Sequence, residues 1–148
     1  MLALVLAVLA AAAPQGADKL TTVRAYVYTE TSASGQPDEE ERGRIAAVKE
    51  LREALAKKKG ISVVDTRADA TLLIEITDRE TRTDSAGSFG GAQITPMGET
   101  VLRMRLRSGA DESELKGMGI TSGRAAKDAA DRILKWIARR EPPRKGAA

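Results

Sequence analysis

The segment TVLRMRLRSG (residues 100–109) constrains the fold most, because apolar and basic side chains alternate strictly from Leu102 to Arg107. Successive side chains of a β-strand point to opposite faces of the sheet, so this alternation predicts a strand with one apolar and one basic face. A strand of this kind fits an antiparallel sheet that is covered on one side and open on the other. The apolar face carries Leu102, Met104 and Leu106, and the basic face carries Arg103, Arg105 and Arg107.

Four other segments predict strands. They are VRAYVYTE (23–30), ISVVD (61–65), ATLLIEITDRETR (70–82) and ESELKGMGI (112–120). In the first of them, Arg24, Tyr26 and Tyr28 share the polar face. In the long third segment, Glu75 lies on the polar face and alternates with apolar residues, the chief of which are Leu72, Ile74 and Ile76. The last segment is the weakest, because glycines interrupt it.

Residues 38–59 and 124–140 predict two amphipathic helices. Asp38 and Glu41 form a capping-box pattern at the start of the first helix, in which each side chain bonds an orphan backbone N–H, and Gly60 supplies its end. Apolar residues at helical spacing give each helix a stripe that faces the sheet. The stripes consist of Ile45, Val48, Leu51 and Leu55 in the first helix and of Ala126, Ala130, Ile133 and Ile137 in the second.

The order strand, helix, four strands, helix predicts an α+β fold, namely a two-layer sandwich with two helices on one face of a mixed sheet. A helix joins the first two strands, so we expect them to be parallel through a right-handed crossover. The later strands follow one another closely and predict an antiparallel meander. We expect one domain over residues 18–141 and a basic, flexible tail at 142–148.

The chain opens with an unbroken apolar run at residues 2–13. A membrane-spanning helix needs about 20 residues, so the run is too short to span a bilayer. Its composition is that of the apolar region of a secretory signal peptide, and the alanines at 10–12 offer a cleavage site. We therefore expect residues 1–17 to be a signal peptide and the mature protein to be periplasmic or secreted. A buried N-terminal strand or helix is the alternative.

The chain contains no Cys and no His. Their absence excludes thiol nucleophiles, disulfides, histidine general bases and a lipid-anchoring Cys, and it removes the usual zinc ligands. We expect no metal, no cofactor and no enzymatic activity. The turn KGMGITSG (116–123) carries glycines with the spacing G-x-G-x-x-x-G, which differs from the dinucleotide fingerprint. A small-ligand or phosphate site there is the alternative to a turn that only joins a strand to a helix.

The open face of the sheet and the Gly-rich loop at residues 84–98 are the candidate binding surfaces. Arginines and tyrosines on one face suit a protein partner, an anionic envelope polymer or single-stranded nucleic acid stacked on the rings. Cross-strand Arg–Glu pairs on a solvated face are the simpler interpretation, and export argues against nucleic acid. The candidate partner-binding residues are Tyr26, Tyr28, Phe89, Arg103, Arg105 and Arg107.

The stretch VKELREALAKKKGISVVDTRADATLLIEI (48–76), followed by the meander and the closing helix AAKDAADRILKWI (125–137), resembles a group of bacterial envelope proteins. The group comprises CsgG-like curli secretion components, the N-terminal domain of TolB and the LPS-assembly lipoprotein LptE. The resemblance implies a small α/β domain behind a signal sequence. It also implies a non-enzymatic accessory role in assembly or secretion, with another envelope protein as partner.

Overall fold

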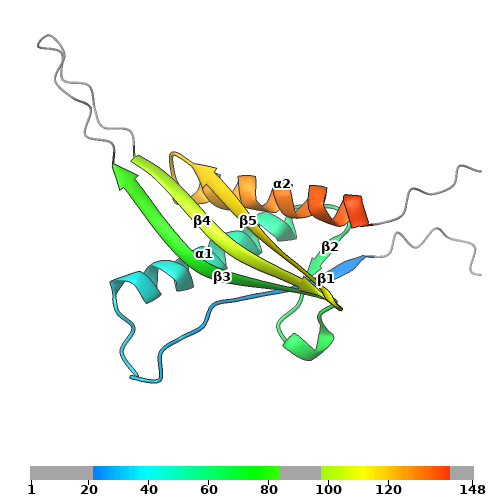
Figure 1. Cartoon of the computed structure of the whole chain (residues 1–148), viewed down its shortest axis with the longest axis horizontal. Coiled ribbons are helices and arrows are strands. Elements are labelled where there is room, and N and C mark those ends of the chain that lie inside the picture. The colour runs from blue at the N-terminus through cyan, green and yellow to red at the C-terminus, as the bar shows by residue number, and fades with distance from the viewer. Residues whose placement is uncertain (1–21, 84–97, 141–148) are drawn as a thin grey trace, which may run out of the picture.

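The computed structural model describes residues 22–83 and 98–140, which together form a five-stranded sheet with two long helices. The strands are β1 (Val23–Tyr28), β2 (Ile61–Val63), β3 (Leu72–Thr83), β4 (Gly98–Ser108) and β5 (Asp111–Gly119). The helices are α1 (Glu39–Ala56) and α2 (Ser122–Arg140), and a 3₁₀ turn, η1 (Arg67–Asp69), leads into β3. Both long helices lie on the same side of the sheet (Figure 1). The predicted two-layer α+β fold is confirmed.

The strand order in the sheet is β2-β1-β3-β4-β5. Strand β1 is parallel to both of its neighbours, whereas β3, β4 and β5 form an antiparallel meander. The parallel crossover from β1 through α1 to β2 and the meander both agree with the sequence pattern. The insertion of β1 between β2 and β3 was not predicted, because both neighbours are parallel to it and no local pattern orders such strands.

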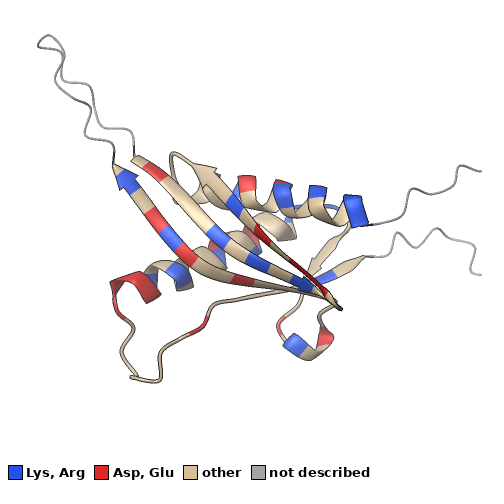
Figure 2. Ribbon diagram, in the orientation of Figure 1, with Lys and Arg blue, Asp and Glu red and all other residues tan. Residues whose placement is uncertain are grey.

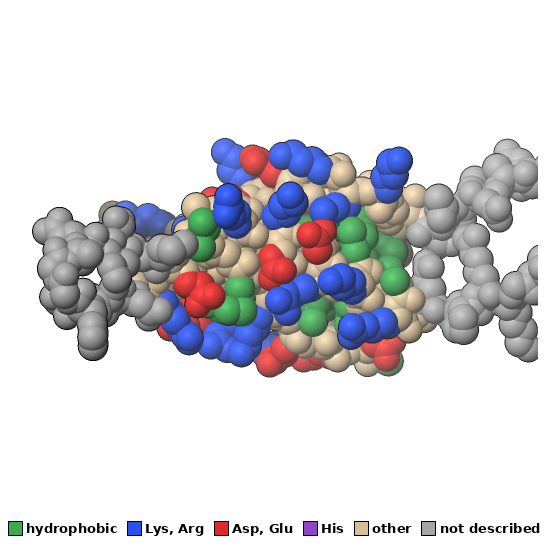
Figure 3. All heavy atoms as spheres, turned by 90° about the horizontal axis from the view of Figure 1, so that it is seen from above, with side chains coloured by type: hydrophobic (Ala, Val, Ile, Leu, Met, Phe, Trp, Pro, Cys, Tyr) green, Lys and Arg blue, Asp and Glu red, His purple; other side chains and the backbone are tan. Residues whose placement is uncertain are grey.

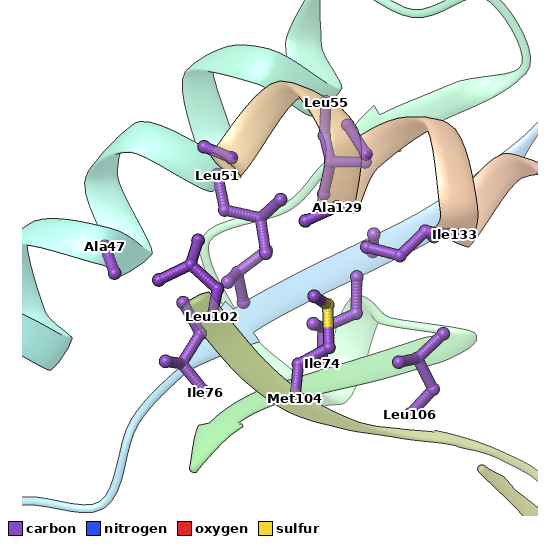
Figure 4. Close-up of a cluster of buried hydrophobic side chains, with 14 of the residues drawn as sticks. Ala47, Leu51, Leu55, Ile74, Ile76, Leu102, Met104, Leu106, Ala129 and Ile133 are labelled. Carbon is purple, nitrogen blue, oxygen red and sulfur yellow. The ribbon is translucent and has the colours of Figure 1, made fainter. Parts of the chain in front are cut away.

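The core lies between the sheet and the helices. Alternate residues of β1, β3 and β4 point toward the helices, as the alternation predicts, and Leu102, Leu106 and Ile74 have no exposed surface. Helix α1 contributes Leu51 and Leu55, which meet these strand residues in the middle of the core (Figure 4). Helix α2 contributes mainly alanines, so it lies close to the strands. Its buried residues are Ala125, Ala126, Ala129 and Ala130, together with the larger Ile133.

Helix α1 departs from the sequence prediction at its start. The side chain of Asp38 caps the helix by accepting from the N–H of Glu41 at 2.7 Å. The other predicted hydrogen bond of the capping box, in which the Glu41 carboxylate accepts from the backbone N–H of Asp38, is wrong. The carboxylate instead accepts from Ser32, from its N–H at 2.9 Å and from its Oγ at 2.7 Å. Glu41 is only 4% exposed, so it fixes the segment between β1 and α1 onto the helix.

The apolar stripe of α1 also lies differently from the prediction. Ile45 is 42% exposed, whereas Ala47, Leu51 and Leu55 have no exposed surface. The buried side of the helix thus follows residues four apart. Ile45 comes two residues before Ala47, which is about 200° around the helix, and so it faces away from the core. No helix in the described ranges is long and apolar enough to cross a membrane.

Candidate binding face of the sheet

The open face of the sheet is the side away from α1 and α2, and a row of arginines on β4 runs along it. Arg103, Arg105 and Arg107 alternate with the buried core residues of the same strand, as predicted. Acidic residues on the neighbouring strands flank this row on both sides (Figure 2). The open face is therefore charged but nearly balanced in sign.

The outer members of the arginine row each contact a carboxylate on an adjacent strand. The Nε of Arg103 lies 3.4 Å from Oδ2 of Asp78 on β3, and a second nitrogen lies 3.9 Å from Glu80. The Nε of Arg107 donates a hydrogen bond of 3.1 Å to Oε2 of Glu112 on β5. These pairs agree with the simpler interpretation of the face as a set of cross-strand ion pairs.

Arg105 lies at the centre of the network. It lies opposite Glu75 on β3 and Glu114 on β5, with nitrogen–oxygen distances of 3.7 and 3.8 Å. Its Nε is 3.3 Å from Oε1 of Glu112, but the two groups are not aligned for a hydrogen bond and this nitrogen is buried. Glu75 is only 8% exposed, so Arg105 is the cation that compensates a largely desolvated carboxylate.

A β-bulge at Thr77 decides which acidic side chains reach the open face. The pairing of β3 with β4 shifts by one residue between Ile76 and Asp78. Asp78 therefore lies opposite Arg103 on the open face, while Arg79 turns to the helix side and donates to the carbonyl of Gly43 at 3.3 Å. One extra residue in a strand moves every later side chain to the opposite face of the sheet.

The two tyrosines of β1 stack against each other on the same face. The ring centroids of Tyr26 and Tyr28 are 5.7 Å apart, and the ring planes differ by 16°. The guanidinium of Arg67 in η1 lies 5.4 Å from the centroid of Tyr28. Burial, and next the nearby Glu75 carboxylate, raise the pKa of the Tyr28 hydroxyl. Both rings are thus engaged in contacts within the chain.

The predicted site residues fall into two groups separated by β3. Two cross-strand rows connect them on the open face. One row runs from Tyr28 through Glu75 to Arg105, and the other runs from Tyr26 through Leu73 to Arg107. The sequence correctly placed the tyrosines and arginines on one face, but it missed Asp78 and Glu80. Phe89 and nearly all of the predicted loop at 84–98 lie outside the described residues.

Two glycines of the turn at 116–123, Gly117 and Gly119, allow α2 to pack closely on β5. A Cβ on Gly117 would lie 2.5 Å from the carbonyl oxygen of Ala125, and one on Gly119 would lie 2.5 Å from the backbone nitrogen of the same residue. The side of the strand that these glycines face therefore has no room for a phosphate. Thr121 starts the helix, because its carbonyl accepts from Ala125 N–H at 2.9 Å and its Oγ accepts from Arg124 N–H at 3.3 Å.

Seen from above, the side on which α2 lies, the surface shows basic and acidic side chains interspersed and hydrophobic side chains in small separate groups (Figure 3). A hollow of about 260 Å³ between the helices is lined by both signs of charge, with Glu50, Glu53, Lys57, Lys58 and Lys127 among its lining residues. In the ranges that the structure describes, no group of three or more His, Cys, Asp or Glu side chains is arranged to hold a metal ion.

No protein-family model and no curated protein matches the sequence. Among solved structures, the fold is similar to that of a protein from Caulobacter crescentus CB15 described as a "putative lipoprotein". The two share 15% sequence identity with a TM-score of 0.40, over 83% of this chain and 95% of the other. A similarity of this size assigns the chain to no family.

Proposed function

We propose that the protein is an exported, non-enzymatic accessory protein of the bacterial envelope that binds another protein through the open face of its sheet. The observation that carries the binding part is the open face itself, where ordered charges lie beside two stacked tyrosines. Tyrosine and arginine are the residue types that binding surfaces favour. Export rests on the apolar run at residues 2–13 and the small residues around its end.

The charge pattern favours a protein over a polyanion as partner. The arginines of β4 have carboxylates within 3.1–3.9 Å, so a polyanion has to compete with these intramolecular partners. A protein surface with both signs of charge can instead complement the acidic and basic rows together. An anionic envelope polymer is the rival outcome of the binding experiment.

Cell fractionation with N-terminal sequencing tests export. We expect the native protein in the envelope or secreted fraction, with a mature N-terminus near Ala13 or at Asp18. An intact Met1 on protein found in the cytoplasm would contradict the proposal.

Site-specific photo-crosslinking in the native cell tests the binding face. A photoreactive phenylalanine analogue at Tyr26 reports on the open face, and the same analogue at the exposed Lys127 on α2 is the matched control. We expect a discrete protein adduct from position 26 and none from position 127. Equal adducts from both positions, or a polymer smear from position 26, would contradict a protein-binding open face. Thermal melts of both variants establish that each is folded.

A further inference from the structure

The two edges of the sheet differ in length and in exposure. The edge strand β2 has three residues, whereas β5 at the other edge has nine. The N–H of Met118 donates to Oδ2 of Asp128 in α2 at 2.9 Å, so the backbone of Met118 points away from β4. Strand β5 pairs with β4 without a register shift, and backbone groups alternate in direction along such a strand. The N–H and C=O groups of Glu114 and Lys116 therefore also point to the free edge.

This edge lacks the protection that Asp128 gives to Met118. No hydrogen bond within the described residues engages the edge-facing backbone groups of Glu114 and Lys116. An open strand edge is a template for pairing with another strand. Lys116 also lies directly opposite Arg103 on β4, and like charges directly opposite each other destabilise a sheet. A carboxylate beside Lys116 would offset that repulsion.

We propose that a second copy of the chain pairs with this edge, with the two β5 strands antiparallel about a two-fold axis at Leu115. Glu114 then lies opposite Lys116 of the partner subunit, and Lys116 lies opposite Glu114 of the partner subunit. Each of these pairs exchanges two backbone hydrogen bonds and joins opposite charges. The two sheets become one continuous sheet. This inference is independent of the proposed envelope partner.

Charge selects this register among the symmetric ones. An axis at Glu114 or at Lys116 places that residue against itself, and an axis at Ser113 places Glu112 against the glutamate at 114. An axis between two residues would place a residue whose N–H and C=O point to the free edge opposite a residue whose N–H and C=O already bond β4, so the two could not pair. The axis at Leu115 alone among these gives two opposite-charge pairs without a like-charge pair. It also brings the two half-buried Leu115 side chains together on the helix side.

Charge reversal tests the proposed pairing in sedimentation experiments on the purified protein with its native mature N-terminus. The variants are Glu114→Lys and Lys116→Glu, each of which turns both opposite-charge pairs into like-charge pairs. We expect each to raise the dimer Kd roughly ten- to a hundredfold. Within one chain their effects are opposite, because Glu114→Lys places a cation beside Arg105 whereas Lys116→Glu gives Arg103 a carboxylate. If both substitutions weaken the dimer, the cause is therefore the contact between chains and not an effect within one chain.

Mixing the two variants gives the decisive result. In a mixed dimer every Lys at 114 or 116 of one chain lies opposite a Glu of the other, so we expect the equimolar mixture to regain wild-type affinity. Circular dichroism and thermal melts confirm that each variant is folded. A wild-type chain that sediments as a monomer at every accessible concentration overturns the proposal. A dimer that neither charge reversal weakens, or that mixing does not restore, overturns it as well.

Discussion

Alternate residues of β4 show how differently the two faces of one sheet are built. Leu102, Met104 and Leu106 on the covered face are at most 1% exposed. The arginine side chains between them are 33–39% exposed and contact carboxylates on the adjacent strands. Burying one large apolar side chain contributes about 1.5–3 kcal/mol, whereas an exposed ion pair contributes about 0–1 kcal/mol.

The difference between the faces separates the residues that stabilise the fold from those that contribute little to its stability. The covered face depends on close contact between helices and strands, so changes there affect folding first. The open face contributes less to stability, so its residues can change or bind a partner with little effect on the fold. Substitutions on each face, compared with matched controls, measure this difference.

The largest effect is expected for Leu51→Ala on α1. Leu51 has no exposed surface and lies in the middle of the core, so truncation leaves a cavity and lowers the free energy of unfolding by about 3–5 kcal/mol. The control is Ile45→Ala on the same helix. This substitution should change the free energy of unfolding by about 1 kcal/mol or less, because Ile45 is 42% exposed. Urea unfolding of both variants measures the two values. Equal losses would contradict the buried side assigned to α1.

A second substitution tests the close approach of α2 to β5. Gly117→Ala places a methyl group 2.5 Å from a backbone oxygen and 2.6 Å from the Cβ of Ala129, so helix and strand must separate. We expect a loss of about 2–3 kcal/mol. Gly123→Ala is the control in the same turn, since its Cβ meets nothing within 4 Å and alanine favours a helix by up to about 1 kcal/mol. A neutral Gly117→Ala would show that the two elements are not in close contact.

On the open face, the largest effect is expected for Arg105→Ala. This change leaves the Glu75 carboxylate, which is 8% exposed, without its nearby cation, and we expect a loss of about 1–2 kcal/mol. Arg107→Ala should cost less than about 1 kcal/mol, because its partner Glu112 is solvated. Adding Glu75→Gln to Arg105→Ala should restore part of the loss in urea unfolding. Equal costs for the two arginines would show that Glu75 is not the reason.

The periodicity of the sequence predicted the faces wherever apolar residues recur. Strand β4 and the first half of β3 have a buried apolar residue at every second position, and this sets the phase of the alternation. Residues 77–83 are all polar, so no pattern reveals that Thr77 is an extra residue. The carboxylates of Asp78 and Glu80 were missed at the candidate site for that reason.

Other features depend on contacts between distant segments. In the sequence Gly117 and Gly119 only interrupt a predicted strand, and their role in close packing is evident only from the position of α2 against them. Ile45 was placed in the core because hydrophobicity was counted without knowing which side of α1 faces the sheet. The capping pattern at Asp38 and Glu41 was half correct, because a more distant residue, Ser32, competes for the Glu41 carboxylate.

The smallest effect, and the one most specific to the open face, is the alkaline titration of Tyr28. Burial and the Glu75 carboxylate raise its pKa in the folded protein above the usual value of about 10. The folded state therefore keeps this proton at a pH where the unfolded chain has lost it. The contribution to stability is complete below about pH 10 and is lost as the pH rises through the pKa of the folded state.

Tyrosinate absorbance in a Tyr26→Phe variant isolates this titration, since the chain has two tyrosines. We expect Tyr28 to ionise above its usual pKa, and adding Glu75→Gln should move the pKa back down because it removes a negative charge beside the hydroxyl. The substitution of the exposed Ile45 on α1 by Ala is distant from the open face and should leave the titration unchanged. A pKa at or below the usual value would show that burial and the Glu75 carboxylate do not dominate the surroundings of the Tyr28 hydroxyl, and it would contradict the contact between β1 and β3 described for the open face.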